Sequence, residues 1–426
     1  MGRERLHDHA RLDQGITQGT TGGKAVLHYP GRRSEREQPS RREVLKGAAA
    51  LSLAAAASAW PGARQAALAA SPVVRGYGVT TSQLKDWSIM EQAIGIRMDF
   101  TGTNADIGMF MRDVISNDLG ETHDIFIFDG GTEDVLGPQG YYAEVIEDHP
   151  ELTLWERTPD ARKRTDLMQA EGKQYGVPVI GNADSFGYFP EAIGADPGGL
   201  DEISWAMMYE ADETRGRVSL DRSWLLSMPE VAQFLKHHGR AEIDDVANMT
   251  GEEARVVADY AAERKRAGQF RTLHSAFEEQ VQLLSNREID LINCWEPATK
   301  EANLILGPDT VIYAFTVEGY YKWGHGAYVH TKALARDNVD NIYKVLNYYL
   351  SGEYRALQAQ ERGYAGPNMD LGVKFAEDNG WPQEDIDNLK WTEIKVDRKF
   401  EKPFFGRPGA PNSAIMEEEW QRFLNV

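Results

Sequence analysis

The segment "HDIFIFDGG" (residues 123–131) decides the fold class of this chain. Its centre is an unbroken run of apolar residues, and it ends in two consecutive glycines. Such a run is typical of a strand that is buried on both faces in a parallel sheet. The preceding segment, residues 107–118, carries its apolar side chains at helical spacing. A helix followed by a buried strand indicates an α/β fold.

The same alternation extends along most of the chain. Strands are expected at residues 73–79 and 97–100, at 216–224 leading into a helix, and at 289–294, with extended chain over 175–189. Helices are expected at residues 90–96, 249–268 and 338–352, and the segment 277–297 is expected to form a helix and a turn before its strand. The helix at 249–268 opens with a capping box formed by Thr250 and Glu253. After Gly363 the periodicity is weaker, so the sequence predicts little there.

Composition and charge exclude several classes of function. The 426 residues have ordinary globular composition, and the length is typical of two domains or one large one. A formal net charge of −20 would repel nucleic-acid phosphates, so we expect no nucleic-acid partner. The single cysteine, Cys294, excludes internal disulfides and cysteine-based zinc clusters. The acidic body favours a soluble protein that does not repel cationic ligands.

The first 70 residues read as a targeting region. Residues 40–69 combine a basic start, a short apolar run and an Ala-x-Ala sequence, as in an export signal. The segment "SRREVLK" (residues 40–46) resembles a twin-arginine signal. We therefore expect export by the twin-arginine machinery, cleavage near Ala69 and a periplasmic mature protein. Residues 1–39 are expected to be a disordered or mis-assigned extension.

Polar and aromatic side chains follow the expected strands at their carboxyl ends. These positions include Thr80, Asp129, Asp221 and the pair Trp295 and Glu296. Ligands of open α/β sheets bind outside the carboxyl ends of the strands. Each residue alone is equally compatible with a helix cap or a turn. Together they predict a cleft for a small molecule.

Six segments, in order, resemble the periplasmic solute-binding proteins of ABC importers, specifically the spermidine/putrescine-binding type. They are residues 120–145, 172–194, 215–224, 277–297, 317–333 and 361–368. The resemblance implies an α/β, two-lobed Venus-flytrap fold with crossing hinge strands. Lobe one is expected to hold residues 71–180 and 322–368, and lobe two residues 181–321 and 369–426. It also implies a monomer without a cofactor, a membrane permease with its ATPase as partners, and no enzymatic activity.

The resemblance and the acidic side chains near the expected cleft give a set of candidate ligand-binding residues. They are Thr80, Asp129, Asp184, Asp221, Trp224, Trp295, Glu296, Glu318, Trp323, His325 and Tyr364. In such a site aromatic rings stack on the ligand and carboxylates pair with its ammonium groups. His325 stands where polyamine binders carry an aspartate, and an imidazole does not hold an ammonium as a carboxylate does. Acids remain at Asp129, Asp184, Asp221, Glu296 and Glu318, so we expect a polyamine-like, cationic or zwitterionic solute.

Two other functions compete with this interpretation. Tyr320 and Tyr321, with Glu318 and His325 nearby, are compatible with a ferric-iron-binding transport protein. Adjacent strand residues point to opposite faces, however, so both tyrosines reach one metal only in a loop. A periplasmic enzyme using the same cleft is the other alternative. The sequence contains neither an HExxH nor a GxSxG motif, and Cys294 lies inside an apolar run.

Overall fold

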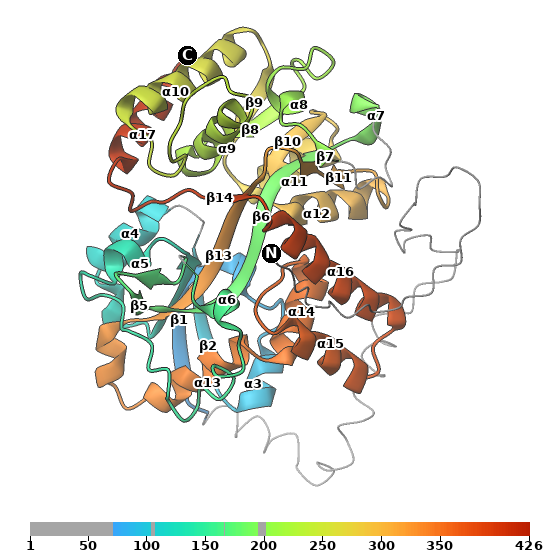
Figure 1. Ribbon diagram of the computed structural model, residues 1–426. Coiled ribbons are helices and arrows are strands. Elements are labelled where there is room, and N and C mark those ends of the chain that lie inside the picture. Colours follow the sequence, from blue (N-terminus) through green and yellow to red (C-terminus); the bar gives the residue numbers. More distant parts are fainter. Residues whose placement is uncertain (1–70, 104–106, 166, 195–201) are drawn as a thin grey trace, which may run out of the picture.

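The computed structural model describes residues 71–103, 107–165, 167–194 and 202–426 (Figure 1). The expected export signal, its cleavage site and the N-terminal extension lie outside these residues. Within the described chain, no helix has the length and apolar character needed to cross a membrane.

One continuous sheet runs through the molecule in the order β2-β1-β3-β13-β6-β10-β8-β9. Its strands are β1 (Val73–Val79), β2 (Arg97–Thr103), β3 (Ile125–Asp129), β6 (Gly176–Tyr188), β8 (Val218–Asp221), β9 (Phe270–His274), β10 (Leu291–Cys294) and β13 (Tyr320–Val329). β1 pairs in parallel with β2 and β3, and β8 pairs in parallel with β9 and β10. Two parallel groups therefore lie at the two ends of the sheet, and the α/β class is confirmed.

The long strands β6 and β13 connect the two groups. They pair with each other antiparallel, from Gly176 beside Tyr328 to Asp184 beside Tyr321. The C-terminal part of β13 also pairs with β3, whereas residues 185–188 of β6 pair with β10. The chain thus crosses between two halves along this strand pair (Figure 1). We call them the first half, around β1 to β3, and the second half, around β8 to β10.

Helices cover both halves. The first half carries α3 (Ser88–Ile94), α4 (Ile107–Ile115), α5 (Glu133–Leu136), α13 (Val339–Tyr349) and α14 (Gly352–Arg362). The second half carries α9 (Trp224–His237), α10 (Gly251–Arg266), α11 (Phe277–Ser285) and α12 (Glu296–Leu306). The predicted capping box is present at the start of α10, where Thr250 and Glu253 bond reciprocally. The short elements are α6 (Asp160–Lys163), α7 (Pro190–Ile193), α8 (Ala206–Tyr209), β4 (Gln169–Ala170), β5 (Lys173–Gln174), β7 (Glu202–Ile203), β11 (Ile312–Tyr313), β12 (Phe315–Thr316), η1 (Thr80–Ser82), η2 (Leu119–Glu121) and η3 (Thr331–Ala335).

The C-terminal region, where the sequence shows weak periodicity, contains three helices and divides between the halves. α15 (Met369–Asp378) and α16 (Gln383–Lys399) share an apolar core with α14 in the first half. β14 (Pro403–Phe404) then joins β13, and α17 (Ser413–Leu424) packs on α9 and α10. The packing therefore differs from the expected single lobe for residues 369–426, because the apolar face of α15 and α16 is buried against α14.

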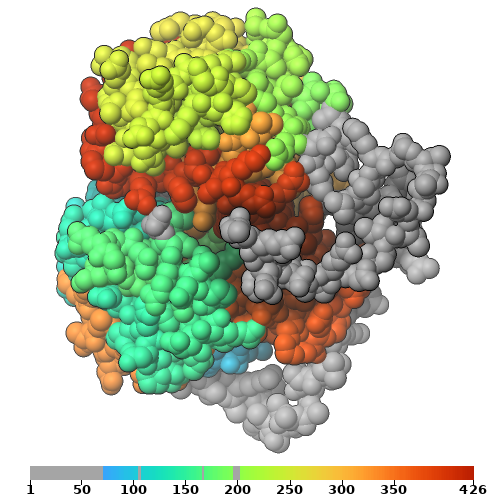
Figure 2. Space-filling view, in the orientation of Figure 1, coloured from blue at the N-terminus to red at the C-terminus, as the bar shows by residue number. Residues whose placement is uncertain are grey.

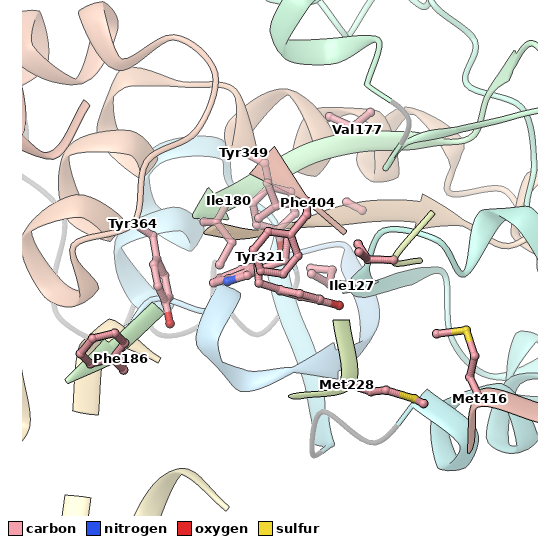
Figure 3. Packing of buried hydrophobic residues seen from close by; sticks show 14 of the residues in the cluster. Ile127, Val177, Ile180, Phe186, Met228, Tyr321, Tyr349, Tyr364, Phe404 and Met416 are labelled. Atoms are coloured by element: carbon pink, nitrogen blue, oxygen red, sulfur yellow. The ribbon is translucent and has the colours of Figure 1, made fainter. Parts of the chain in front are cut away.

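The segment from α16 to α17 crosses the face between the two halves (Figure 2, red). Gly406 lies so close to α9 that an added Cβ would be 2.4 Å from the carbonyl oxygen of Leu225. Beside it, Phe404 packs edge-on against Tyr321 with ring centroids 6.0 Å apart (Figure 3). This contact continues the apolar core from the crossing strands to the C-terminal segment.

Candidate functional site

The carboxyl ends of the parallel strands from both halves meet beside the crossing strands. Asp129 ends β3 of the first half, and Asp221 ends β8 of the second. Asp184 lies at the crossing on β6, and the buried Tyr321 lies opposite it on β13. The charges of Asp129 and Asp184 both help to raise the pKa of the Tyr321 hydroxyl, after the larger effect of burial. The tertiary structure therefore brings acids from both halves into one region.

In the first half His325 has a polar partner at each ring nitrogen. His325 Nε2 lies 3.1 Å from Asp129 Oδ1, and its Nδ1 is hydrogen-bonded to the Ser82 hydroxyl. The Trp323 ring packs against His325, at 5.0 Å between centroids, and edge-on against Tyr364, at 5.2 Å. The imidazole of His325 is therefore buried beside the rings of Trp323 and Tyr364, which we call the aromatic wall. It does not lie at the surface, where a carboxylate could meet a ligand directly.

The second half contains a small cavity of about 10 Å³, close to the space that one water molecule needs. It is lined by Asp184, Asp221, Leu226, Glu230, Gln280, Asn293, Cys294 and Trp295. The Asn293 side chain donates to Glu230 Oε2 over 2.9 Å, and Gln280 Oε1 accepts from the Trp295 backbone N–H. The cavity is therefore built from carboxylates, amides and one indole.

The three acids of this cavity have raised pKa values because they are buried. Burial raises the pKa of Asp184 to about 7, although Trp323 and Lys399 act in the opposite direction. Burial likewise raises the pKa of Asp221 to about 6, with the backbone N–H of Ser223 opposing the shift. The pKa of Glu230 is also raised by burial. A cation in this cavity would favour the ionised carboxylates by direct charge pairing.

Glu296, at the start of α12, has a different environment. Lys395 and Lys399 of α16 both pair with its carboxylate, and Lys399 Nζ lies 3.2 Å from Glu296 Oε2. Burial would raise the pKa of Glu296, but the ammonium groups of Lys395, Lys399 and Lys300 outweigh it and lower the pKa. This carboxylate is already neutralised by the chain itself.

Other predicted residues lie at the margin of the site or outside it. Thr80 is exposed in η1, and Trp224 is half-buried at the start of α9. Glu318 accepts hydrogen bonds from the Ser204 hydroxyl, the Trp205 backbone N–H and His238. Because its side chain is fully buried among these donors, Glu318 has a structural position, not one that faces the cavity.

The geometry gives little support to an iron site. Tyr320 and Tyr321 are consecutive residues of β13, and they belong to separate apolar clusters. In the described part of the chain, no group of three or more His, Cys, Asp or Glu side chains is arranged to hold a metal ion.

Sequence reasoning missed several polar residues of this region, among them Ser82, Glu230, Gln280, Asn293, Lys395 and Lys399. For the two lysines a signal exists in the sequence. They continue the stripe of buried positions Ile386, Leu389, Thr392 and Val396 on α16. A lysine at a position where the helical pattern demands an apolar residue indicates a buried partner.

No protein-family model matches the sequence, and no curated protein matches it. Solved structures do match the fold. The Tp0655 (TpPotD) lipoprotein of Treponema pallidum aligns with a TM-score of 0.62 at 11% identity, over 82% of this chain and 99% of that chain. The spermidine/putrescine ABC transporter substrate-binding protein PotD from Streptococcus pneumoniae has a TM-score of 0.58 at 12% identity, with coverages of 83% and 99%. The periplasmic binding protein MotA from A. tumefaciens, solved with glucopine, has a TM-score of 0.59 at 15% identity, with coverages of 82% and 99%.

At these identities the likeness establishes the fold. The chain has the two-lobed α/β fold that these substrate-binding proteins share, and the predicted fold class is confirmed.

Proposed function

We propose that this protein is the substrate-binding component of an ABC importer, which captures a small cationic or zwitterionic organic solute between its two halves. The observation that carries the proposal is the cavity beside the crossing strands. It is lined by Asp184, Asp221 and Trp295 on the second-half side of the crossing strands. Tyr321 on the crossing strand lies within the electrostatic influence of both Asp184 and Asp129 of the first half, so the cavity adjoins the boundary between the halves. A ligand that contacts both halves binds the closed state more tightly than the open state. Binding therefore shifts the protein toward the closed state, in which the two halves approach each other across the strand pair.

The cavity has space for about one water molecule in the arrangement described here. A larger solute therefore enters when the halves separate, and it widens the cavity on binding. The closed form would then present the surfaces of both halves to a membrane permease driven by an ATPase. We further propose export by the twin-arginine machinery with cleavage near Ala69, a periplasmic location, a monomeric state and no catalytic activity.

We also propose a division into lobes, which the packing of the C-terminal helices supports. We assign residues 71–180 and 322–400 to lobe one, and residues 181–321 and 401–426 to lobe two. This division keeps α15 and α16 with the helix α14 against which they pack.

Thermal-shift screening of the mature protein with polyamines, amino acids and opines tests the proposal, because a true ligand raises the melting temperature in a dose-dependent manner.

Replacing Trp323 or Trp295 with alanine should then weaken binding by about 1 kcal/mol or more, as expected for an aromatic side chain in contact with a ligand. Trp381→Ala, in the loop between α15 and α16, is the matched control and should leave the affinity unchanged. Unchanged affinity in both site variants would contradict the assignment of the site. Turnover of a substrate without stable binding would favour the enzyme alternative.

A further inference from the structure

Two lysines of α16 reach from the first half into the region of the cavity. Only 8% of Lys395 and 1% of Lys399 are exposed. Lys399 Nζ lies 3.2 Å from Glu296 Oε2, 3.4 Å from Asn182 Oδ1 and 4.4 Å from the centre of the Tyr313 ring. Lys395 holds the other carboxylate oxygen of Glu296.

These partners are the groups that the ammonium of a bound solute would use. A carboxylate, an amide oxygen and an aromatic face together form a recognition site for an amine. Here the chain's own lysine occupies it. A diamine whose second ammonium needed Glu296 would have to displace Lys399 and leave that ammonium buried without a counter-charge, which is strongly unfavourable.

The lysines also supply more positive charge than Glu296 balances. Lys395, Lys399 and Lys300 all act on this one carboxylate, which lies in the first turn of α12. The buried ammonium of Lys399 also acts electrostatically on Asp184 at the cavity wall. The region around α12 and α16 is therefore a cationic pole that adjoins the cavity.

The cavity lining also contains the acids Asp221 and Glu230, which we call the acidic pole. Two buried ring nitrogens nearby, of His274 and Trp323, have no hydrogen-bond partner among the described residues. His274 Nε2 lies 3.5 Å from Asp221 Oδ2 without a hydrogen bond, and the Trp323 indole N–H approaches Asp184 without good hydrogen-bond geometry. Buried polar atoms without a hydrogen-bond partner are uncommon, and here they lie beside two acids of the cavity, on separate strands.

We propose that Lys395 and Lys399 determine the specificity of this site, so that it selects a zwitterion of the basic amino-acid type and rejects the corresponding linear diamine. The ligand's ammonium or guanidinium pairs with Asp221 and Glu230. Its carboxylate pairs with the ammonium groups of Lys399 and Lys395. The inference rests on the proposed function and narrows its ligand class.

Pairs of solutes that differ only in one carboxylate group measure the contribution of that group to binding. Ornithine and putrescine, lysine and cadaverine, and arginine and agmatine differ only by this group. Isothermal titration of the mature protein should show tighter binding of the amino acid in at least one pair, by about tenfold or more, since a charge-assisted hydrogen bond is expected to contribute at least that factor.

Lys399→Met should reduce this preference by about tenfold, because it removes one carboxylate partner and exposes Glu296 and Asp184 to the diamine. Lys395 still pairs with Glu296 in this variant, so the carboxylate keeps a counter-charge. Lys399→Arg should retain the preference in part. Lys402→Met is the control, since Lys402 pairs with Glu202 at the surface. Circular dichroism and the melting temperature without ligand verify that each variant folds.

The outcomes separate the two proposals. Equal affinity for both members of the pairs that bind, or an unchanged preference in folded Lys399→Met, would overturn the role of the lysines and leave the transport function standing. If only solutes outside these pairs bind, the assignment of the ligand to the basic amino-acid type is wrong. If no solute of the whole screen binds, the transport function itself fails.

Discussion

The two halves of the site deal with buried polar groups in opposite ways. In the first half, His325 is hydrogen-bonded to Ser82 and lies 3.1 Å from the carboxylate of Asp129, and 29% of the Asp129 side chain remains exposed. In the second half, Asp184, Asp221 and Glu230 surround a cavity, and burial raises the pKa of each. In the first half, His325 has partners among the neighbouring side chains. In the second half, the buried carboxylates lose the hydration that would stabilise their charge.

This difference indicates a division of roles. A satisfied network gives a fixed wall, because each group already has its partner. Buried acids without a full set of partners disfavour ionisation, and a bound cation relieves that penalty. The second half is therefore the part of the site whose energy depends most on ligand and on pH.

The largest expected effect concerns the ion pairs of Glu296. Glu296→Gln leaves Lys395 and Lys399 buried without a counter-charge, and we expect the free energy of unfolding to fall by about 3 to 5 kcal/mol. Urea unfolding at neutral pH measures this change. Glu202→Gln, which removes the partner of the exposed Lys402, should cost less than about 1 kcal/mol. Similar losses in the two variants would show that the buried and exposed pairs do not differ.

The pH dependence of stability tests the acids of the second half. The folded pKa of Asp221 is about 6, above its ordinary value of 3.8, so the folded state binds more protons between these values. Its contribution is full below about pH 4 and is lost as the pH rises to about 6, which amounts to about 3 kcal/mol. Asp184, with a pKa of about 7, extends the loss to neutral pH.

Urea unfolding from pH 4.5 to pH 8 without ligand should therefore show a decline, and Asp221→Asn should make it shallower. Asp129→Asn, in the first half, serves as the matched control and should leave the decline in place. A flat profile in the unmodified protein would contradict the raised pKa values of the buried acids.

The smallest expected effect is in the first half. His325→Ala removes the contacts to Asp129 and Ser82, and we expect a loss of about 1 to 2 kcal/mol in the free energy of unfolding, as for one or two hydrogen bonds. Ser82→Ala removes one of these contacts and should cost less. If His325→Ala does not change the free energy of unfolding, the contacts of His325 with Asp129 and Ser82 do not stabilise the first half.

The sequence predicted the strands and helices around the site because their patterns are local. The apolar run of β3, the capping box of α10 and the helix–strand pair of α11 and β10 each depend on neighbouring residues. The long helix α16 was missed. Its buried stripe contains Thr392, Lys395 and Lys399, and these polar residues interrupt the apolar periodicity by which helices are recognised.

The sequence by itself determined the α/β class, the strand ends that carry Asp129, Asp221 and Trp295, and the unusual position of His325. Only the tertiary structure decided the partners of these groups. It paired His325 with Asp129, placed Lys395 and Lys399 on Glu296, and enclosed Asp184, Asp221 and Glu230 around one cavity. The physical reason is that periodicity and capping act over a few residues, whereas burial and charge pairing depend on segments that are distant in the chain and meet only when the two halves pack together.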